Sequence, residues 1–152
     1  MGNGVAVPRS DHLEKQPATE VDPRFPSGEW KGFWLQRGLA GRQWMSLVLQ
    51  FVEGHVSGEG RDAVGEFLIR GDYDLTTGRC TLTKTYSGSH DVSYVGANEG
   101  DGKWLWGVWK ILIETGGWHL WPKGEPDPTG SELKAAKPIP AERRVIVEPV
   151  EA

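Results

Sequence analysis

Residues 64–97, VGEFLIRGDYDLTTGRCTLTKTYSGSHDVSYVGA, contain three short apolar-rich runs separated by two glycine-containing turns. Within each run apolar and polar side chains tend to alternate, which is the period-2 pattern of a strand with one buried face. The turns DLTTG and SGSH are short, and short turns join neighbouring antiparallel strands. The same pattern continues in both directions and predicts eight strands, over residues 29–36, 44–52, 55–60, 64–73, 79–86, 91–97, 103–113 and 117–121.

Proline and tryptophan divide the chain into three parts. All ten prolines lie outside residues 27–121, whereas all eight tryptophans lie inside that stretch. Proline cannot donate a hydrogen bond to a sheet and tryptophan buries a large apolar area, so residues 28–121 are predicted to form one β-barrel domain. Residues 1–27 are predicted to be a flexible segment, and residues 122–152 a proline-rich tail with a short helix over 131–137.

The connections between the predicted strands are short, except for a longer loop over residues 37–43. Short connections favour a meander, in which each strand pairs with the next, and eight such strands close into an up-and-down barrel without exposed edges. The predicted fold is therefore all-β: an eight-stranded antiparallel barrel with weakly structured N- and C-terminal tails. The strand over 103–113 is apolar on both faces, so we expect a tail, a partner or a second copy in a homodimer to cover its outer side.

Charge and cysteine content narrow the class of protein. The net charge is −4 and no run of Lys or Arg occurs, so we expect neither a nucleic-acid nor a membrane partner. A single cysteine, Cys80, excludes an internal disulfide. Residues 1–16 lack the apolar core of a signal peptide, and no apolar run is long enough to span a bilayer. These features predict a cytoplasmic protein.

Metal and cofactor motifs are missing from the sequence. The four histidines do not have the spacing of metal ligands, and Cys80 has no second cysteine in a C-x-x-C pair. No nucleophile-elbow, phosphate-binding or dinucleotide-binding motif occurs. We therefore expect no metal and no cofactor. Asp62, which follows Gly60 and Arg61 at the end of a predicted strand, is interpreted as a turn former rather than an acid.

The first predicted strand begins with the motif Gly28-Glu29-Trp30. This G-x-W resembles the motif that starts the first strand of calycin-type barrels, the lipocalins and avidins. The resemblance implies a ligand-binding meander barrel over residues 28–121, with Trp30 at the closed end and Arg143 or Arg144 stacked across it. The lipocalin disulfide is absent, and the polar groups with which avidins hold biotin cannot be placed in this chain, so biotin is not implied.

The stretch from Lys84 to Tyr94 carries the candidate binding residues. Lys84 and Tyr86 share a face of one strand, and His90 and Tyr94 share a face of its neighbour across the turn. If that face is internal, an amine, two phenols and an imidazole lie near one mouth of the barrel, where burial lowers the pKa of the lysine. Alternation also permits the opposite arrangement, in which the threonines of the same strand face inward, because threonine occurs on either face of a sheet.

Apolar residues are predicted to surround this cluster. We expect Phe67 and Trp109 to line the same cavity. The rest of the predicted apolar interior comprises Phe33, Leu47, Leu49 and Ile69.

Three functions are compatible with these features. The first is the binding of a small hydrophobic or amphipathic molecule, with the ligand-binding residues Lys84, Tyr86, His90, Tyr94, Trp109 and Phe67. The second is a non-catalytic interaction or self-association domain with a packed interior, because side chains alone can fill an eight-stranded barrel; its exposed face would bear Trp104 and Trp106. The third is an enzyme that uses a phenol or imidazole of the cluster as acid or base and the lysine to stabilise charge. We favour the first two functions over catalysis.

Overall fold

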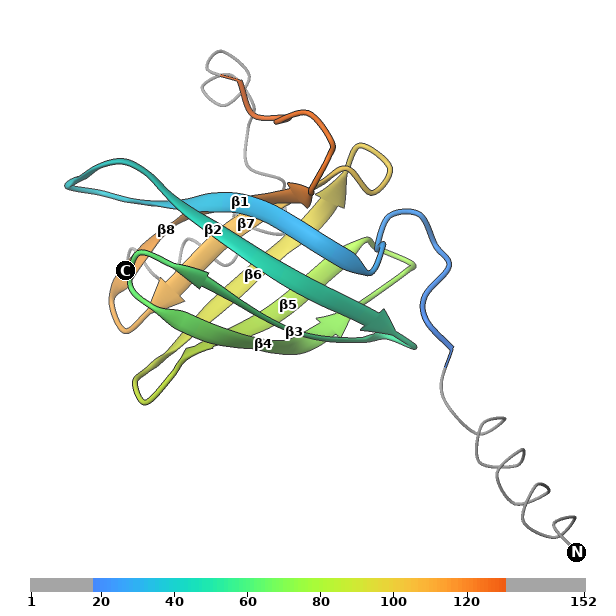
Figure 1. The fold of residues 1–152 in the computed structure, drawn as a ribbon, viewed down its shortest axis with the longest axis horizontal. Coiled ribbons are helices and arrows are strands. Elements are labelled where there is room, and N and C mark those ends of the chain that lie inside the picture. Colours follow the sequence, from blue (N-terminus) through green and yellow to red (C-terminus); the bar gives the residue numbers. More distant parts are fainter. Residues whose placement is uncertain (1–17, 131–152) are drawn as a thin grey trace, which may run out of the picture.

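The computed structural model describes residues 18–130, and its eight strands form one closed antiparallel barrel (Figure 1). Each strand pairs with the next and β8 pairs with β1, so the predicted all-β meander barrel is confirmed. No helix in this part of the chain is long and apolar enough to cross a membrane. The predicted helix over 131–137, and Arg143 and Arg144, lie outside the described residues. The strands are β1 (Gly28–Gln36), β2 (Leu39–Val52), β3 (His55–Asp62), β4 (Glu66–Tyr73), β5 (Arg79–Tyr86), β6 (Asp91–Glu99), β7 (Trp104–Ile111) and β8 (Glu114–Pro122).

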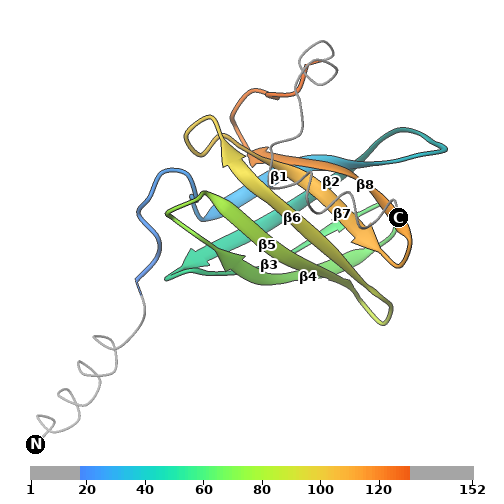
Figure 2. The ribbon, with the colours of Figure 1, turned by 180° about the vertical axis from the view of Figure 1, so that it is seen from behind.

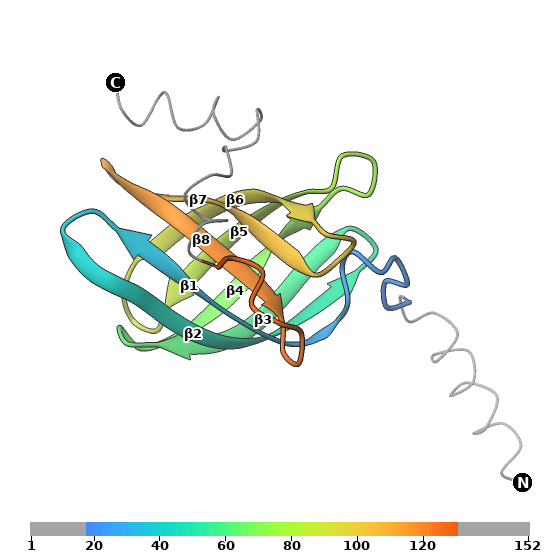
Figure 3. The same ribbon diagram turned by 90° about the horizontal axis from the view of Figure 1, so that it is seen from above.

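The first hairpin differs from its prediction. β2 begins at Leu39 rather than at residue 44, because Gln36 pairs with Leu39 and only Arg37 and Gly38 form the turn. Gly38 has a φ of +84°, a left-handed conformation that glycine adopts without steric strain. The residues predicted as a long loop therefore extend two paired strands, which project beyond the rest of the barrel (Figure 3).

Side chains alternate between the interior and the outer wall, as the period-2 pattern predicts. In β2, Met45, Leu47, Leu49 and Phe51 are buried, and the residues between them are exposed. Interior side chains from all eight strands join them in one continuous cluster. This core fills the barrel from the end next to residues 18–27 up to the candidate functional site near the opposite end.

The orientation of β1 corrects one prediction. Trp30 and Trp34 belong to the interior cluster, so Phe33 lies on the outer wall and not in the barrel. Phe33 is nevertheless buried there. The guanidinium of Arg42 lies 4.4 Å from the centre of its ring, and Trp44 packs edge-on at 5.2 Å.

The outer side of β7, on the wall seen in Figure 2, carries a stack of aromatic rings. Trp104 and Trp106 stack at 5.4 Å between ring centres, and His119 of β8 stacks on both. Stacked rings hide each other's faces, and the Trp106 indole donates a hydrogen bond to Glu99. The two tryptophans are only 5% and 6% exposed, so the prediction of an exposed tryptophan face is wrong.

Residues 18–27 lie against one end of the barrel, at the right of Figure 1. Phe25 is fully buried, and its ring centre lies 4.8 Å from that of Tyr73. The indole of Trp30 donates a hydrogen bond of 2.9 Å to the carbonyl of Pro26. The N-terminal part of the described chain therefore closes this end with apolar side chains.

Candidate functional site

The opposite end of the barrel, at the left of Figure 1, is its mouth and is formed by the β1–β2, β3–β4, β5–β6 and β7–β8 turns. It contains a cavity of about 310 Å³, within the range of small-molecule sites. Gln36, His90 and Glu114 contribute its polar rim. The aromatic and aliphatic residues of its lining are Trp34, Tyr86, Tyr94, Trp109, Val64, Val92 and Ile111.

A lysine is enclosed beneath this cavity. Lys84 is 1% exposed, and its ammonium donates hydrogen bonds to Asp62 Oδ2 at 2.6 Å and to the Tyr94 hydroxyl at 3.2 Å. The ammonium also donates to Met45 Sδ at 3.7 Å, and its nitrogen lies 4.3 Å from the centre of the Phe67 ring. All three hydrogens of the ammonium therefore have an acceptor, and aromatic faces surround the charge.

Asp62 is the residue of this site that sequence analysis missed. Its side chain is 0% exposed, and Oδ2 accepts hydrogen bonds from Lys84, from the Tyr86 hydroxyl at 2.6 Å and from Trp34 Nε1 at 3.1 Å. Oδ1 accepts two backbone N–H groups of the β3–β4 turn, so Asp62 also forms the predicted turn. Alternation along β3 could have revealed this position. If the strand predicted to end at Gly60 is extended by two residues, residue 62 falls on the inner face.

Burial and hydrogen bonding set the charges of these groups. Burial lowers the pKa of Lys84 from 10.5 to about 8, although its pairing with Asp62 acts in the opposite direction. Burial acts to raise the pKa of Asp62, but hydrogen bonds from Lys84 and Tyr86 outweigh it and hold that pKa below its usual value. Burial also raises the pKa of the Tyr86 and Tyr94 phenols. At neutral pH the site therefore contains a charged pair and two protonated phenols.

The structure brings most of the predicted cluster together. Lys84, Tyr86 and Tyr94 point into the barrel, whereas the alternate residues of β5, which include its threonines, lie on the outer face. His90 does not share their burial. It is exposed in the β5–β6 turn, with its ring centre 5.4 Å from that of Tyr86, and lines the rim of the cavity.

Trp109 and Phe67 take different places. Trp109 lines the cavity, and its indole donates a hydrogen bond of 2.9 Å to the Leu35 carbonyl. This indole lies over Gly116, where a Cβ atom would be 2.6 Å from Trp109 Nε1, so the position leaves no room for a side chain. Phe67 lies in the core beneath the Lys84 ammonium and is not among the residues that line the cavity.

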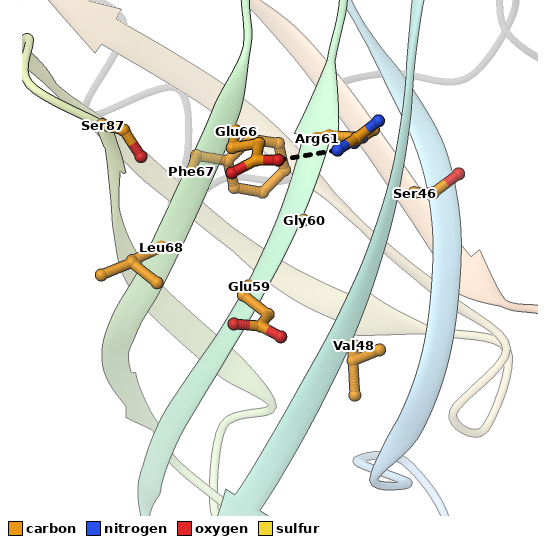
Figure 4. Close-up of a pocket in the computed structure, with 9 residues that line it drawn as sticks. All are labelled: Ser46, Val48, Glu59, Gly60, Arg61, Glu66, Phe67, Leu68 and Ser87. Atoms are coloured by element: carbon orange, nitrogen blue, oxygen red, sulfur yellow. Dashed lines mark hydrogen bonds and ion pairs between the residues drawn. The ribbon is translucent and has the colours of Figure 1, made fainter.

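A second hollow, of about 360 Å³, lies on the outer wall across β2, β3 and β4 (Figure 4). Its charged side chains are Glu59 and an ion pair of 2.7 Å between Arg61 and Glu66. The two members of that pair are 71% and 67% exposed, so water competes for them and their attraction is weak. None of the charged side chains lining this hollow is buried, in contrast to the pair beneath the mouth.

Comparison with known proteins gives no family for this chain. No family model, no curated protein and no solved structure matches it. Within residues 18–130, no group of three His, Cys, Asp or Glu side chains is arranged to hold a metal ion. The geometry of the mouth is therefore the basis for a functional proposal.

Proposed function

We propose that the protein binds a small, largely apolar molecule in the mouth cavity. The observation that carries this proposal is the cavity of about 310 Å³ that lies above the buried Lys84–Asp62 pair. Ligand sites typically combine apolar walls with a few polar groups in fixed positions. Trp34 and Trp109 supply such walls here, and the phenols at the base of the cavity supply the polar groups.

The buried ion pair supports a binding role over simple filling of the barrel. Burying a charged group costs several kcal/mol, and a protein in which apolar side chains of similar volume replace a buried ion pair is often at least as stable. A barrel that only had to fill its interior would therefore gain little from Lys84 and Asp62. In the proposed site the pair has a use, because it holds the hydroxyls of Tyr86 and Tyr94 in place.

The same groups favour binding over catalysis. The raised pKa values of Tyr86 and Tyr94 keep both phenols protonated at neutral pH, so neither is a suitable general base. Asp62 already accepts hydrogen bonds from three side chains and two backbone N–H groups. Its carboxylate is thus committed to holding the site together.

We extend the proposal to a relationship with calycin-type barrels. Trp30 of the Gly28-Glu29-Trp30 motif is buried at the end of the barrel against which residues 18–27 lie. That is the place which the resemblance implies for this tryptophan. Core side chains occupy the lumen between Trp30 and Lys84, so the proposed ligand would use only the mouth.

Titration with uncharged aromatic molecules, followed by NMR of the tryptophan indole N–H groups, tests the proposed site. Val92 lines the cavity, so Val92→Phe should narrow it and weaken binding at least tenfold. Val21→Phe, at an exposed position beside the closed end, is the matched control and should leave binding unchanged. Equal binding by both variants, or no shift of the Trp34 and Trp109 signals, would contradict the proposal.

A second candidate function is self-association through the outer wall of β2–β4. Trp44, Val48 and Leu68 favour it, because these apolar side chains are 48%, 40% and 55% exposed on this wall. Sedimentation velocity should then show a dimer that Val48→Lys converts to a monomer. A wild-type protein that stays monomeric at all concentrations tested would exclude this candidate.

A further inference from the structure

We infer that the molecule bound in the mouth cavity is uncharged and presents a hydrogen-bond acceptor, such as a carbonyl oxygen, to the hydroxyl of Tyr94. This inference rests on the proposed function and adds the chemical class of the ligand to it. Two features carry it: a donor in the site that has no acceptor, and charges that already compensate each other.

The Tyr94 hydroxyl has a hydrogen to donate and no acceptor for it among the described residues. Its oxygen accepts a hydrogen bond from the Lys84 ammonium, so its own hydrogen must point elsewhere. Both oxygens of Asp62 accept from other donors: Oδ2 from Lys84, Tyr86 and Trp34, and Oδ1 from two backbone N–H groups of the β3–β4 turn. Tyr94 is buried yet lines the cavity, and buried donors are normally paired. A ligand acceptor above Tyr94 would complete the pairing.

A second buried donor without an acceptor belongs to the neighbouring ring of Trp118, which is not among the residues that line the cavity. Trp118 Nε1 is buried and has no hydrogen-bond partner in the described part of the chain. The centres of the Trp118 and Tyr94 rings are 5.3 Å apart. An indole N–H only donates, and a phenol whose oxygen already accepts a hydrogen bond has a donor left to use. Of these two donors, the Tyr94 hydroxyl is therefore the one that a ligand in the cavity can reach.

The charges around the cavity disfavour an ionised ligand. Asp62 already compensates Lys84 at 2.6 Å, and Glu114 on the rim carries a further negative charge and accepts a hydrogen bond from Gln36. The other titratable side chain of the lining outside the phenols, His90, is exposed in the rim. Asp62, Glu114 and Lys84 together carry a charge of −1, which disfavours an anion in the cavity. A cation that reached the Tyr94 hydroxyl would instead lie close to the Lys84 ammonium, which is 3.2 Å from that hydroxyl. An uncharged acceptor avoids both costs.

Four naphthalene derivatives substituted at the same ring position test this inference by isothermal titration calorimetry. Acetonaphthone offers a carbonyl oxygen, isopropylnaphthalene has the same shape without an acceptor, naphthoate is an anion, and naphthylmethylammonium is a cation. We expect the ketone to bind at least tenfold more tightly than each of the other three. Tyr94→Phe should reduce the affinity for the ketone to that for the hydrocarbon and leave the hydrocarbon unaffected. Tyr73→Phe, at the closed end of the barrel, is the matched control and should keep the preference.

The outcomes separate this inference from the function on which it rests. Equal binding of the ketone and the hydrocarbon would leave the cavity a binding site but would overturn the inference, as would tighter binding of either ion. Failure of all four probes to bind would overturn the proposed function as well. If Tyr94→Phe does not fold, the carbonyl ¹³C signal of labelled ketone bound to the wild type replaces it. A downfield shift on binding indicates the hydrogen bond, and an unshifted signal contradicts it.

Discussion

Replacing Lys84 by methionine should destabilise the barrel strongly, because it leaves the Asp62 carboxylate buried without its counter-charge. Lys84 is 1% exposed and the Asp62 side chain 0% exposed, so water cannot take the place of the ammonium. Removing one member of a buried ion pair typically costs about 3–5 kcal/mol. Asp62 would keep its hydrogen bonds from Tyr86, Trp34 and the turn, so we expect the lower part of that range, about 3 kcal/mol.

Urea unfolding followed by tryptophan fluorescence measures this loss. With a urea dependence of about 1–3 kcal/mol per molar, the unfolding midpoint should fall by roughly 1–3 M. The variant Lys84→Met/Asp62→Asn removes both charges and keeps a side-chain oxygen for the β3–β4 turn. It should be more stable than Lys84→Met alone by about 1–2 kcal/mol, since neighbouring groups of one network are coupled.

The sign of this coupling is the decisive result. A cost below about 1 kcal/mol for Lys84→Met would mean that the Asp62 carboxylate is solvated without its partner. A double variant less stable than Lys84→Met would likewise refute the account of a charge left uncompensated. In either case the pair could not hold the phenols of the proposed site as described.

Three further predictions concern pH, the closed end and the wall of the cavity. The pKa of Lys84 is about 8 in the folded protein against an ordinary 10.5, so the unfolded chain binds more protons between these pH values. The contribution of Lys84 to the free energy of unfolding should therefore rise from pH 8 to pH 10.5. The difference between the stability–pH profiles of wild type and Lys84→Met measures this rise, and a flat difference would contradict the lowered pKa. Phe25→Ala should cost about 3–5 kcal/mol because it empties a fully buried position, whereas Val21→Ala, at an exposed position, should cost almost nothing in the same urea assay. Gly116→Ala should destabilise the protein by about 1–3 kcal/mol because its Cβ would lie 2.0 Å from a carbonyl oxygen; Gly117→Ala, whose Cβ would lie 3.8 Å from its nearest neighbour, should be tolerated, and equal melting temperatures would contradict this reason.

Local pattern was sufficient to group Lys84, Tyr86 and Tyr94, although it left open whether they face the interior. Lys84 and Tyr86 are two residues apart in one strand, and Tyr94 follows in the next strand after a short turn. Period-2 alternation and a short hairpin relate these positions whatever the rest of the chain does. Such pairs can therefore be predicted from neighbouring residues alone.

Asp62 could not be assigned its partner in the same way. β3 and β5, which carry Asp62 and Lys84, are separated by β4 and are not hydrogen-bonded to each other. Their side chains meet because the closed sheet curves and turns its inner face back on itself. That contact depends on the curvature of the whole barrel, which no local pattern of residues contains.

The sequence by itself determined the number of strands, their order and the meander, because alternation and turn length are local properties of the chain. Only the tertiary structure decided which face of β1 and of β5 became the interior. β1 carries Phe33 beside Trp34, and both are large enough to fill a core, yet closure placed Trp34 inside and Phe33 on the outer wall. The same closure buried a lysine against an aspartate and left a cavity above them, because the path of all eight strands fixes the shape of the space they enclose.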